Sequence, residues 1–250
     1  MEMKINSLDI IIPVYNEGNN IKDTLDYLSI NIRNIKKIKY TVYIVYDFDD
    51  DDTLPVIRRI RKDYNFKVVL LKNETGGVVN AIKKGFQTSK GDYILVTMAD
   101  KSDDYEILPD MVKKARNGDD IICASRYMKG GRLIGGPFFK QLLSRIAGIS
   151  LHFLTRIPTH DVTNSYKLYN REVIKKIKIE SDGGFEIGLE ILVKAYLLGY
   201  KIGEVPSRWW DRSEGVSKFK LFKWIPKYLK WYYFLIKELY SRKLKNIFYL

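Results

Sequence analysis

Apolar residues along the chain alternate between two kinds of pattern. Short runs of aliphatic, β-branched and aromatic residues, typical of buried strands, cover 8–14, 41–45, 66–71, 93–98, 121–124, 163–169 and 200–206. Helical spacing or helix-end signals mark segments that start near 21 and 53 and segments over 78–88, 106–117, 137–157 and 185–198. Strands that alternate with helices predict an α/β fold, with a mostly parallel sheet covered by helices on both faces.

Polar clusters follow three of these expected strands. Residues 15–17 follow the first strand, residues 47–52 follow the second and include five acids in six positions, and residues 100–104 follow the fourth. Ligands of open α/β sheets bind at the carboxyl ends of the strands. We therefore expect the functional site at this edge of the sheet.

The acids of these clusters can be interpreted in two ways, as metal ligands or as helix caps. Carboxylate oxygens suit Mg²⁺ or Mn²⁺, which commonly bridge to phosphate oxygens. Alternatively, the acids at 100–104 cap the helix near 106, and most of those at 47–52 cap the helix that starts at Thr53. Asp47 lies nearest its strand end and is the best functional candidate of its run.

Composition narrows the class of protein. The chain has 250 residues, 46% of them hydrophobic and 29% charged, which fits a folded α/β domain over 1–217 with an appended segment over 218–250. The formal net charge of +13 permits anionic partners, but no nucleic-acid-binding module is recognisable. Cys123 is the only cysteine and has no disulfide partner, and two histidines cannot build a histidine-rich metal site.

The ends of the chain bear on localisation. The first residues have no signal-peptide shape, and no apolar run reaches about 18 residues. We expect a cytoplasmic protein whose contact with a membrane is peripheral.

An ordered set of motifs over about residues 8–220 resembles glycosyltransferase family 2, most closely its polyprenyl- or dolichyl-phosphate mannose or glucose synthases. The motifs lie at 10–17 (Ile-Ile-Ile-Pro-Val-Tyr-Asn-Glu), 45–53, 76–85, 98–100, 125–131, 161–169, 203–206 and 212–218. The resemblance implies a GT-A fold, a Rossmann-like three-layer architecture. Two positions depart from the family pattern: Met98 replaces the first acid of Asp-x-Asp, and Tyr46 replaces the first acid of an Asp-Asp pair.

The resemblance also implies roles at the donor site. A nucleotide-diphosphate sugar, linked to GDP or UDP, is expected at Pro13, Tyr15, Glu17, Asp47, Gly77, Asp100, Arg212 and Lys218. The metal ion is expected at Asp100, helped by Asp103, because the Met98 thioether is a poor ligand for a hard ion. Arg212 and Lys218 are expected to close over the phosphates.

Family members use direct displacement with inversion at the anomeric carbon. A hydroxyl acceptor needs a general base, for which Glu190 and Asp161 are the candidates, whereas a lipid phosphate is already ionised. Glu190 has the alternatives of orienting an arginine or forming a buried ion pair. An acceptor phosphate is expected at Arg126, Arg145, Ser165 and Lys167.

The last segment is amphipathic. Five lysines share one helical stripe, and ten large apolar residues cover the other side: Lys220, Lys223, Lys227, Lys230 and Lys237 against Leu221, Trp224, Ile225, Tyr228, Leu229, Trp231, Tyr232, Leu235, Ile236 and Leu239. Basic, aromatic-rich helices of this kind lie at anionic membrane surfaces. The alternative is packing on the protein's own core or in a dimer. Pro226 is expected to kink or split the helix.

Three functions remain in competition. The favoured one is an inverting glycosyltransferase that moves a sugar from a nucleotide donor to a polyprenyl phosphate at the cytoplasmic membrane face. The second is a family 2 enzyme that glycosylates a glycan hydroxyl in surface polysaccharide synthesis. The third is a non-catalytic nucleotide-sugar binder, suggested by the incomplete Asp-x-Asp.

Overall fold

A seven-stranded sheet forms the centre of the molecule. The computed structural model describes residues 3–33, 35–211 and 221–248, except for the side chains of 221–223 and 243–248. The strand order is β3-β2-β1-β4-β7-β5-β8, and only β7 runs antiparallel to its neighbours. The strands are β1 (Ser7–Pro13), β2 (Lys39–Tyr46), β3 (Lys67–Lys72), β4 (Tyr93–Val96), β5 (Ile121–Ser125), β7 (Lys167–Asn170) and β8 (Ile202–Pro206). The predicted mostly parallel α/β sheet is confirmed.

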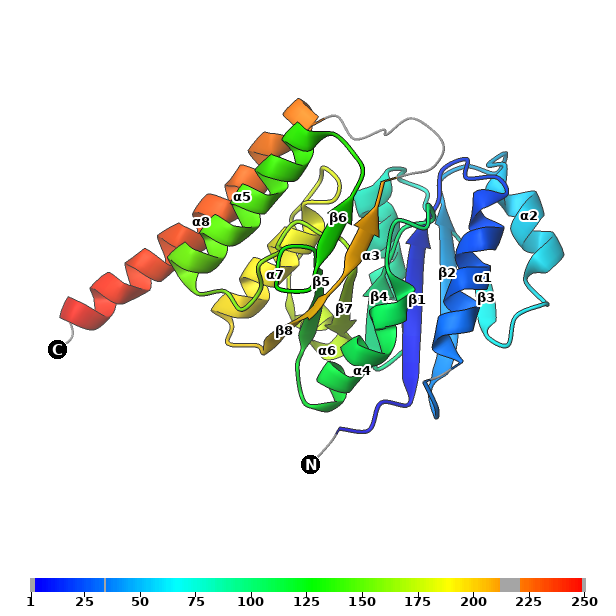
Figure 1. Cartoon of the computed structure of the whole chain (residues 1–250), viewed down its shortest axis with the longest axis horizontal. Helices are drawn as coiled ribbons and strands as arrows, with labels where there is room; N and C mark the ends of the chain where they lie inside the picture. Colours follow the sequence, from blue (N-terminus) through cyan, green and yellow to red (C-terminus); the bar gives the residue numbers. More distant parts are fainter. Residues whose placement is uncertain (1–2, 34, 212–220, 249–250) are drawn as a thin grey trace.

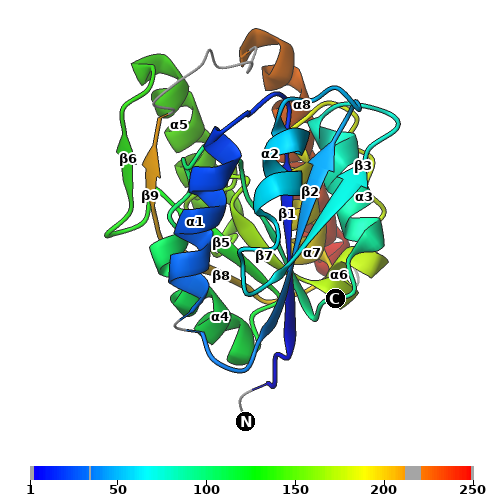
Figure 2. The same ribbon diagram turned by 90° about the vertical axis from the view of Figure 1, so that its right-hand side faces the viewer.

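Helices cover both faces of the sheet, which gives three layers (Figure 2). One face carries α1 (Asn20–Ile32), α2 (Thr53–Ile60) and the short η1 (Tyr105–Ile107) with α4 (Leu108–Arg116); the other carries α3 (Val78–Thr88), α6 (Arg171–Lys176) and α7 (Ile187–Leu197). Strand β1 shows why both faces need cover. Ile10 and Ile12 belong to the first apolar cluster and Ile11 to the second, and all three are fully buried.

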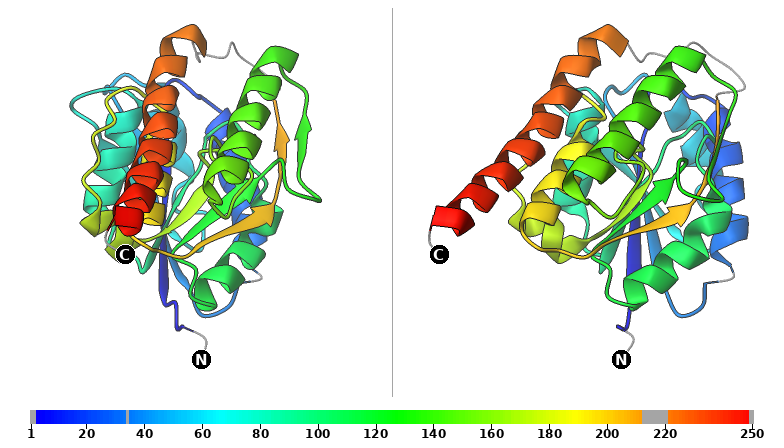
Figure 3. Two further views of the ribbon diagram at one scale, coloured as in Figure 1. Left: turned by 90° about the vertical axis from the view of Figure 1, so that its left-hand side faces the viewer. Right: turned by 60° about the vertical axis from the view of Figure 1, so that its left-hand side comes forward.

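Two long helices lie outside these layers. Helices α5 (Phe138–Thr155) and α8 (Leu221–Phe248) run side by side along one end of the molecule (Figures 1 and 3). A small parallel sheet of β6 (Arg132–Ile134) and β9 (Arg208–Trp210) stands next to α5. Gly148 allows α5 to approach the loop before β7, because a Cβ there would overlap the carbonyl oxygen of His160. Among the helices described, none combines the length and the apolarity needed to cross a bilayer.

Two expectations about elements need correction, and two short strands were not predicted. The strand expected over 163–169 begins only at Lys167, because polar side chains bond the backbone of the preceding loop; Asp161, for example, accepts from Asn164 N. The three-residue strands β6 and β9 carry no pattern long enough to predict. Finally, Pro226 does not split the last segment, which runs as one helix.

Part of the apolar side of α8 packs on the protein. Trp231 and Leu235 are buried, and the Trp231 indole donates to Ser181 Oγ at 3.2 Å. Lys227 pairs with Asp182 at 2.8 Å. Trp231 and Leu235 are therefore not available to a membrane, whereas Tyr233 and Tyr240 are exposed. Lys220 and the side chain of Lys223 lie outside the described residues.

Replacing the buried anchor of α8 tests this docking. We expect Trp231→Ala to lower the free energy of unfolding by about 3–5 kcal/mol, because it leaves a large cavity between α8 and α7. Tyr233→Ala on the exposed side of the same helix is the control and should change it by about 0.5 kcal/mol or less. Urea unfolding measures both values. Equal stability of the two variants would show that α8 is not held against the core.

Candidate active site

A cavity of about 560 Å³ opens where the parallel strands end, between the sheet edge, the β6–β9 sheet and helices α5 and α8. Met98 and Asp100 line it from the segment after β4, and Arg126 lines it from the end of β5. The opposite wall is apolar and comes mainly from the two long helices: Leu143, Ile146, Ala147, Ile225, Leu229 and Tyr232. The cavity thus combines charged groups at the strand ends with a wall of aliphatic and aromatic side chains.

Acids after β2 shape the neighbouring loops. Asp47 accepts from Gly77 N at 2.8 Å and from Asn73 Nδ2 at 2.7 Å, which holds the turn before α3. Gly77 has a φ of +83°, a conformation that favours glycine. Because both Asp47 oxygens are bonded within this turn, Asp47 positions the backbone that a ligand would contact.

The loop after β1 is held in the same way. Asp51 accepts from Asn16 N at 3.1 Å, and Thr53 Oγ1 accepts from Glu17 N at 3.0 Å. Asp51 also caps the start of α2 by accepting from Thr53 N at 2.9 Å. The loop follows Pro13, and its Tyr15 ring meets Phe48 edge-on with centroids 5.1 Å apart. The donor-site residues expected at 13–17, 47 and 77 therefore share the carboxyl edge of the sheet.

The acids after β4 differ sharply in their surroundings. Asp100 lines the cavity and accepts from Ser102 N at 3.1 Å. Asp103, the expected second metal ligand, is instead buried, and its Oδ2 accepts from Thr97 Oγ1 at 2.8 Å and Met98 N at 3.0 Å. The structure does not bring Asp103 into the cavity.

Burial also changes the protonation of Asp103. Desolvation, helped by the charge of Asp100, raises its pKa from 3.8 to about 7, against the opposing hydrogen bonds from Thr97 and Met98. Within the described ranges, no three His, Cys, Asp or Glu side chains come together as a metal cluster. One carboxylate oxygen donor, Asp100, fits a hard cation that takes its remaining ligands from phosphate and water.

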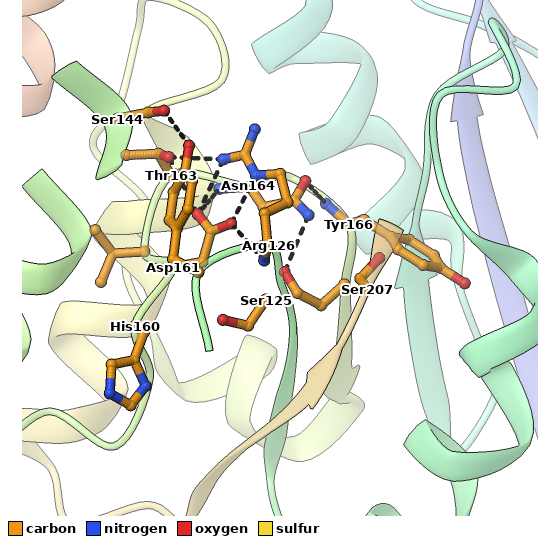
Figure 4. Close-up of polar contacts among 12 residues, drawn as sticks. Ser125, Arg126, Ser144, His160, Asp161, Thr163, Asn164, Tyr166 and Ser207 are labelled. Atoms are coloured by element: carbon orange, nitrogen blue, oxygen red, sulfur yellow. Dashed lines mark hydrogen bonds and ion pairs between the residues drawn. The ribbon is translucent and has the colours of Figure 1, made fainter. Parts of the chain in front are cut away.

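Arg126, which lines the cavity, forms an ion pair with the buried Asp161 (Figure 4). Arg126 Nε donates to Asp161 Oδ2 at 2.6 Å and Nη2 donates to Oδ1 at 2.9 Å, while Thr163 Oγ1 accepts from Nη2 at 3.0 Å. Asp161 also accepts from the backbone N–H groups of Arg126 and Asn164. Nη1 of Arg126 has no partner among the residues that the structure describes.

The expected general bases are both engaged elsewhere. Burial raises the pKa of Asp161, but Arg126 outweighs it, so the pKa lies below its usual value and the carboxylate is a weak base. Glu190 is fully buried, accepts from Glu180 N at 2.6 Å and Ser181 N at 2.7 Å, and pairs with Lys194 at 2.6 Å. Glu190 does not line the cavity. This is the buried ion pair that the sequence left as an alternative.

The four residues expected to bind the acceptor phosphate do not all lie in one cavity. Arg126 and Ser165 line the cavity that contains Asp100, whereas Arg145 lines a neighbouring cavity together with Arg126. Lys167 lines neither; it is fully buried and donates to the carbonyl oxygens of Val162 and Asn164. Burial lowers its pKa. The remaining two donor-site residues, Arg212 and Lys218, lie outside the described residues.

Sequence reasoning missed the residues that tertiary contacts bring to this cavity. Pairing of β6 with β9 places Trp209 and Asp211 on the cavity wall, where Asp211 N donates to Ile134 O at 2.9 Å. Asn164 also lines the cavity and donates to Ala124 O at 3.0 Å. Asn164 falls within the motif at 161–169, and the glycine pair at 135–136 lies next to Asp211, but neither signal assigned these residues to a cavity.

The raised pKa of Asp103 gives a pH-dependent difference in stability. The folded state favours the protonated carboxyl group of Asp103. The contribution of this preference to the free energy of unfolding is therefore complete below about pH 4 and is lost as the pH rises to about 7. Asp103→Asn does not titrate, and its Oδ1 can accept the same two hydrogen bonds. We expect its free energy of unfolding, relative to the wild type, to rise by up to about 4 kcal/mol between about pH 4 and pH 8.

Urea unfolding with a chelator present measures this difference. Asp110→Asn on the exposed side of α4 removes a carboxylate that is not buried and serves as the control. A difference between Asp103→Asn and the wild type that stays constant across this range would mean that Asp103 is ionised throughout.

Comparisons with known proteins agree with this architecture. The model for glycosyl transferase family 2 matches residues 9–178. Dolichol-phosphate mannosyltransferase of Pyrococcus furiosus is 31% identical over 92% of this chain and 64% of its own length. Polyprenol monophosphomannose synthase of Mycolicibacterium smegmatis is 31% identical over 60% of this chain and 58% of its own length. The chain therefore matches less than two thirds of the length of these relatives.

Solved structures show the same fold. Glucosyl-3-phosphoglycerate synthase from Mycobacterium tuberculosis in complex with UDP superposes with a TM-score of 0.66 over 93% of this chain and 80% of that one, at 13% identity. Its complex with Mn²⁺, UDP and glucosyl-3-phosphoglycerate gives 0.62 over 95% and 80%, at 14% identity. These are GT-A glycosyltransferases. With the family model matching 170 of 250 residues, this chain belongs to glycosyl transferase family 2.

Proposed function

We propose that the chain is an inverting glycosyltransferase that moves a sugar from a GDP- or UDP-linked donor to a polyprenyl phosphate at the cytoplasmic face of a membrane. One observation carries the proposal: a single cavity unites Asp100, Arg126 and an apolar wall from α5 and α8. Such a cavity suits an acceptor with a phosphate and a hydrocarbon chain. The names of the two relatives, a dolichol-phosphate mannosyltransferase and a polyprenol monophosphomannose synthase, support this class of acceptor.

The donor would bind along the carboxyl edge of the sheet. Asp47 holds the turn at Gly77, and α3 begins there with no acid in its first turn, so its N-terminal end favours a phosphate. A divalent ion, Mg²⁺ or Mn²⁺, would be held by Asp100 and would neutralise charge on the diphosphate leaving group. Manganese and UDP in a neighbour of the same fold support this assignment. Arg212 and Lys218 are proposed to contact the same phosphates.

Transfer needs few groups from the protein. An oxygen of the acceptor phosphate attacks the anomeric carbon, the bond from that carbon to the donor diphosphate breaks with inversion, and the diphosphate leaves with the bonding electrons. Arg126 orients the acceptor phosphate through Nη1, because its other nitrogens are held by Asp161 and Thr163. Ser165 lines the same cavity and can donate to that phosphate. An ionised phosphate needs no general base, which agrees with the engagement of both expected bases.

The outer side of the two long helices supports a peripheral membrane position. Phe138, Phe153 and Leu154 of α5 are 76%, 78% and 66% exposed, which is unusual for large apolar side chains grouped on one helix. Tyr233 and Tyr240 of the adjacent α8 are exposed as well. We propose that α5, together with the exposed side of α8, contacts the bilayer.

Removing the cavity carboxylate tests the donor site. We expect Asp100→Ala to lose the rise in melting temperature that GDP or UDP gives the wild type with Mn²⁺, because stabilisation by a ligand scales with its affinity. The variant should keep its melting temperature without ligand, since Asp100 is not buried in the core. A thermal-shift series with each nucleotide, with and without Mn²⁺, measures both effects.

The control removes an exposed acid far from the cavity. Asp63→Ala, on the loop between α2 and β3, should respond to nucleotide and Mn²⁺ like the wild type. If Asp100→Ala responds equally well, Asp100 does not hold the metal and the donor site must be reassigned. Transfer of labelled sugar to a polyprenyl phosphate, compared with transfer to a glycan hydroxyl, then separates the two enzymatic functions.

A charge placed on α5 tests membrane contact. We expect Phe153→Glu to reduce co-sedimentation with anionic vesicles about tenfold, because a carboxylate replaces an inserting ring and faces anionic headgroups. Ile30→Glu makes the same change at a 59% exposed position of α1, away from α5 in Figure 1, and should reduce binding far less. Equal effects of both variants would remove α5 from the membrane surface.

A further inference from the structure

A second cavity, of about 450 Å³, adjoins the cavity that contains Asp100, which we call the transfer cavity, and shares Arg126, Leu133 and Gln141 with it. The segment after β5, the start of β6 and the first two turns of α5 form its walls. Four of its lining side chains are cations, Arg126, Lys129, Arg132 and Arg145, and none of the described lining residues is an acid. We name it the basic cavity.

The described residues leave most of the charge of the basic cavity without an opposite charge. Asp161 neutralises Arg126, but Lys129, Arg132 and Arg145 have no ion-pair partner in the part of the chain that the structure describes. Three cations around one small space repel each other, and a bound anion removes this repulsion. Arginine side chains with free donor groups are well suited to phosphate oxygens.

The backbone adds to this preference for an anion. Helix α5 has 18 residues and begins at Phe138, beside the cavity, with no acid in its first turn and no side-chain cap. The uncapped N–H groups and the helix dipole make this end positive. The cations and the helix end therefore act in the same direction.

The rim of the basic cavity indicates an anion that is attached to hydrocarbon. Phe138 and Leu142 line the cavity and are 76% and 39% exposed. The outer side of α5 continues this apolar surface through Phe153 and Leu154, which are 78% and 66% exposed. A soluble anion would use the cations alone, whereas a lipid would use both surfaces.

We propose that the basic cavity binds the phosphate headgroup of an anionic membrane phospholipid, separately from the acceptor in the transfer cavity. The inference rests on the proposed function only in placing α5 at a membrane. A phospholipid held there would dock the β6–α5 side of the protein on the bilayer. Because Arg126 lines both cavities, the mouth of the transfer cavity would then face the surface from which a lipid acceptor enters.

The test measures binding of the full chain to phosphatidylcholine vesicles that contain phosphatidic acid. Lys129→Ala/Arg132→Ala removes two cations of the basic cavity that have no proposed part in transfer. We expect it to weaken vesicle binding about tenfold or more, since each cation near an anionic surface contributes separately. Arg58→Ala/Arg59→Ala removes the same charge from exposed positions on α2, at the far end of Figure 1, and should change binding about twofold at most.

A second arm distinguishes a lipid from a soluble anion. Melting temperatures are recorded with inorganic phosphate and with chloride at equal ionic strength. If phosphate stabilises the wild type but not Lys129→Ala/Arg132→Ala, while both double variants bind vesicles equally, the cavity takes a soluble phosphate and the lipid assignment is wrong.

The remaining outcomes also decide the proposal. Equal losses of vesicle binding in the two double variants indicate diffuse attraction and overturn a defined site, as does failure of the wild type to bind these vesicles. Both double variants change exposed side chains, so we expect both to fold. If Lys129→Ala/Arg132→Ala does not fold, Lys129→Ala alone replaces it and should show a smaller loss of vesicle binding. Vesicle binding needs neither donor nor sugar transfer. If Asp100→Ala responds to nucleotide and Mn²⁺ like the wild type, the proposed donor site is wrong, but the proposed phospholipid site is unaffected.

Discussion

The buried ion pair between Arg126 and Asp161 is the interaction on which the rest of the candidate site depends. It joins the end of β5 to the loop before β7, and it lies beside both cavities. A charge without a partner at this depth would be strongly destabilising, and the pair is tolerated because the carboxylate accepts from the Arg126 guanidinium, the Thr163 hydroxyl and backbone N–H groups. The same bonds fix the direction of Arg126, so that its Nη1 is left without a partner among the described residues.

The acids at the sheet edge act on the site mostly through the backbone. Asp47, Asp51 and Asp103 each accept from main-chain N–H groups and thereby set the turn before α3, the loop after β1 and the segment after β4. Asp100 is the acid after β4 that lines the transfer cavity. A high density of acids in the sequence therefore marks where acids hold the backbone of the loops, and Asp100 differs from these three in lining the cavity.

Helices α5 and α8 line the transfer cavity and also carry exposed apolar side chains. Each has one side against the protein and one side exposed: Leu151 and Trp231 are buried, while Phe153 and Tyr233 are open to the surroundings. Their inner sides form the apolar wall of the transfer cavity, so the helices that present an apolar exterior also line the place where a lipid acceptor would react. This arrangement explains why apolar residues cover most of the circumference of both helices.

The sequence by itself determined the mostly parallel α/β sheet, the alternation of strands and helices along the chain, the edge at which the polar clusters meet and the family, because these depend on local periodicity and on motifs read in order. It could not assign roles to Glu190, Lys167 and Asp103, since a buried charge with partners and a charge in an open site have the same local pattern. Nor could it predict Trp209 and Asp211 at the cavity, because β6 and β9 are short and pair across a long stretch of chain. Tertiary structure decided which polar groups were left facing a cavity, because burial and partners arise only when distant segments meet.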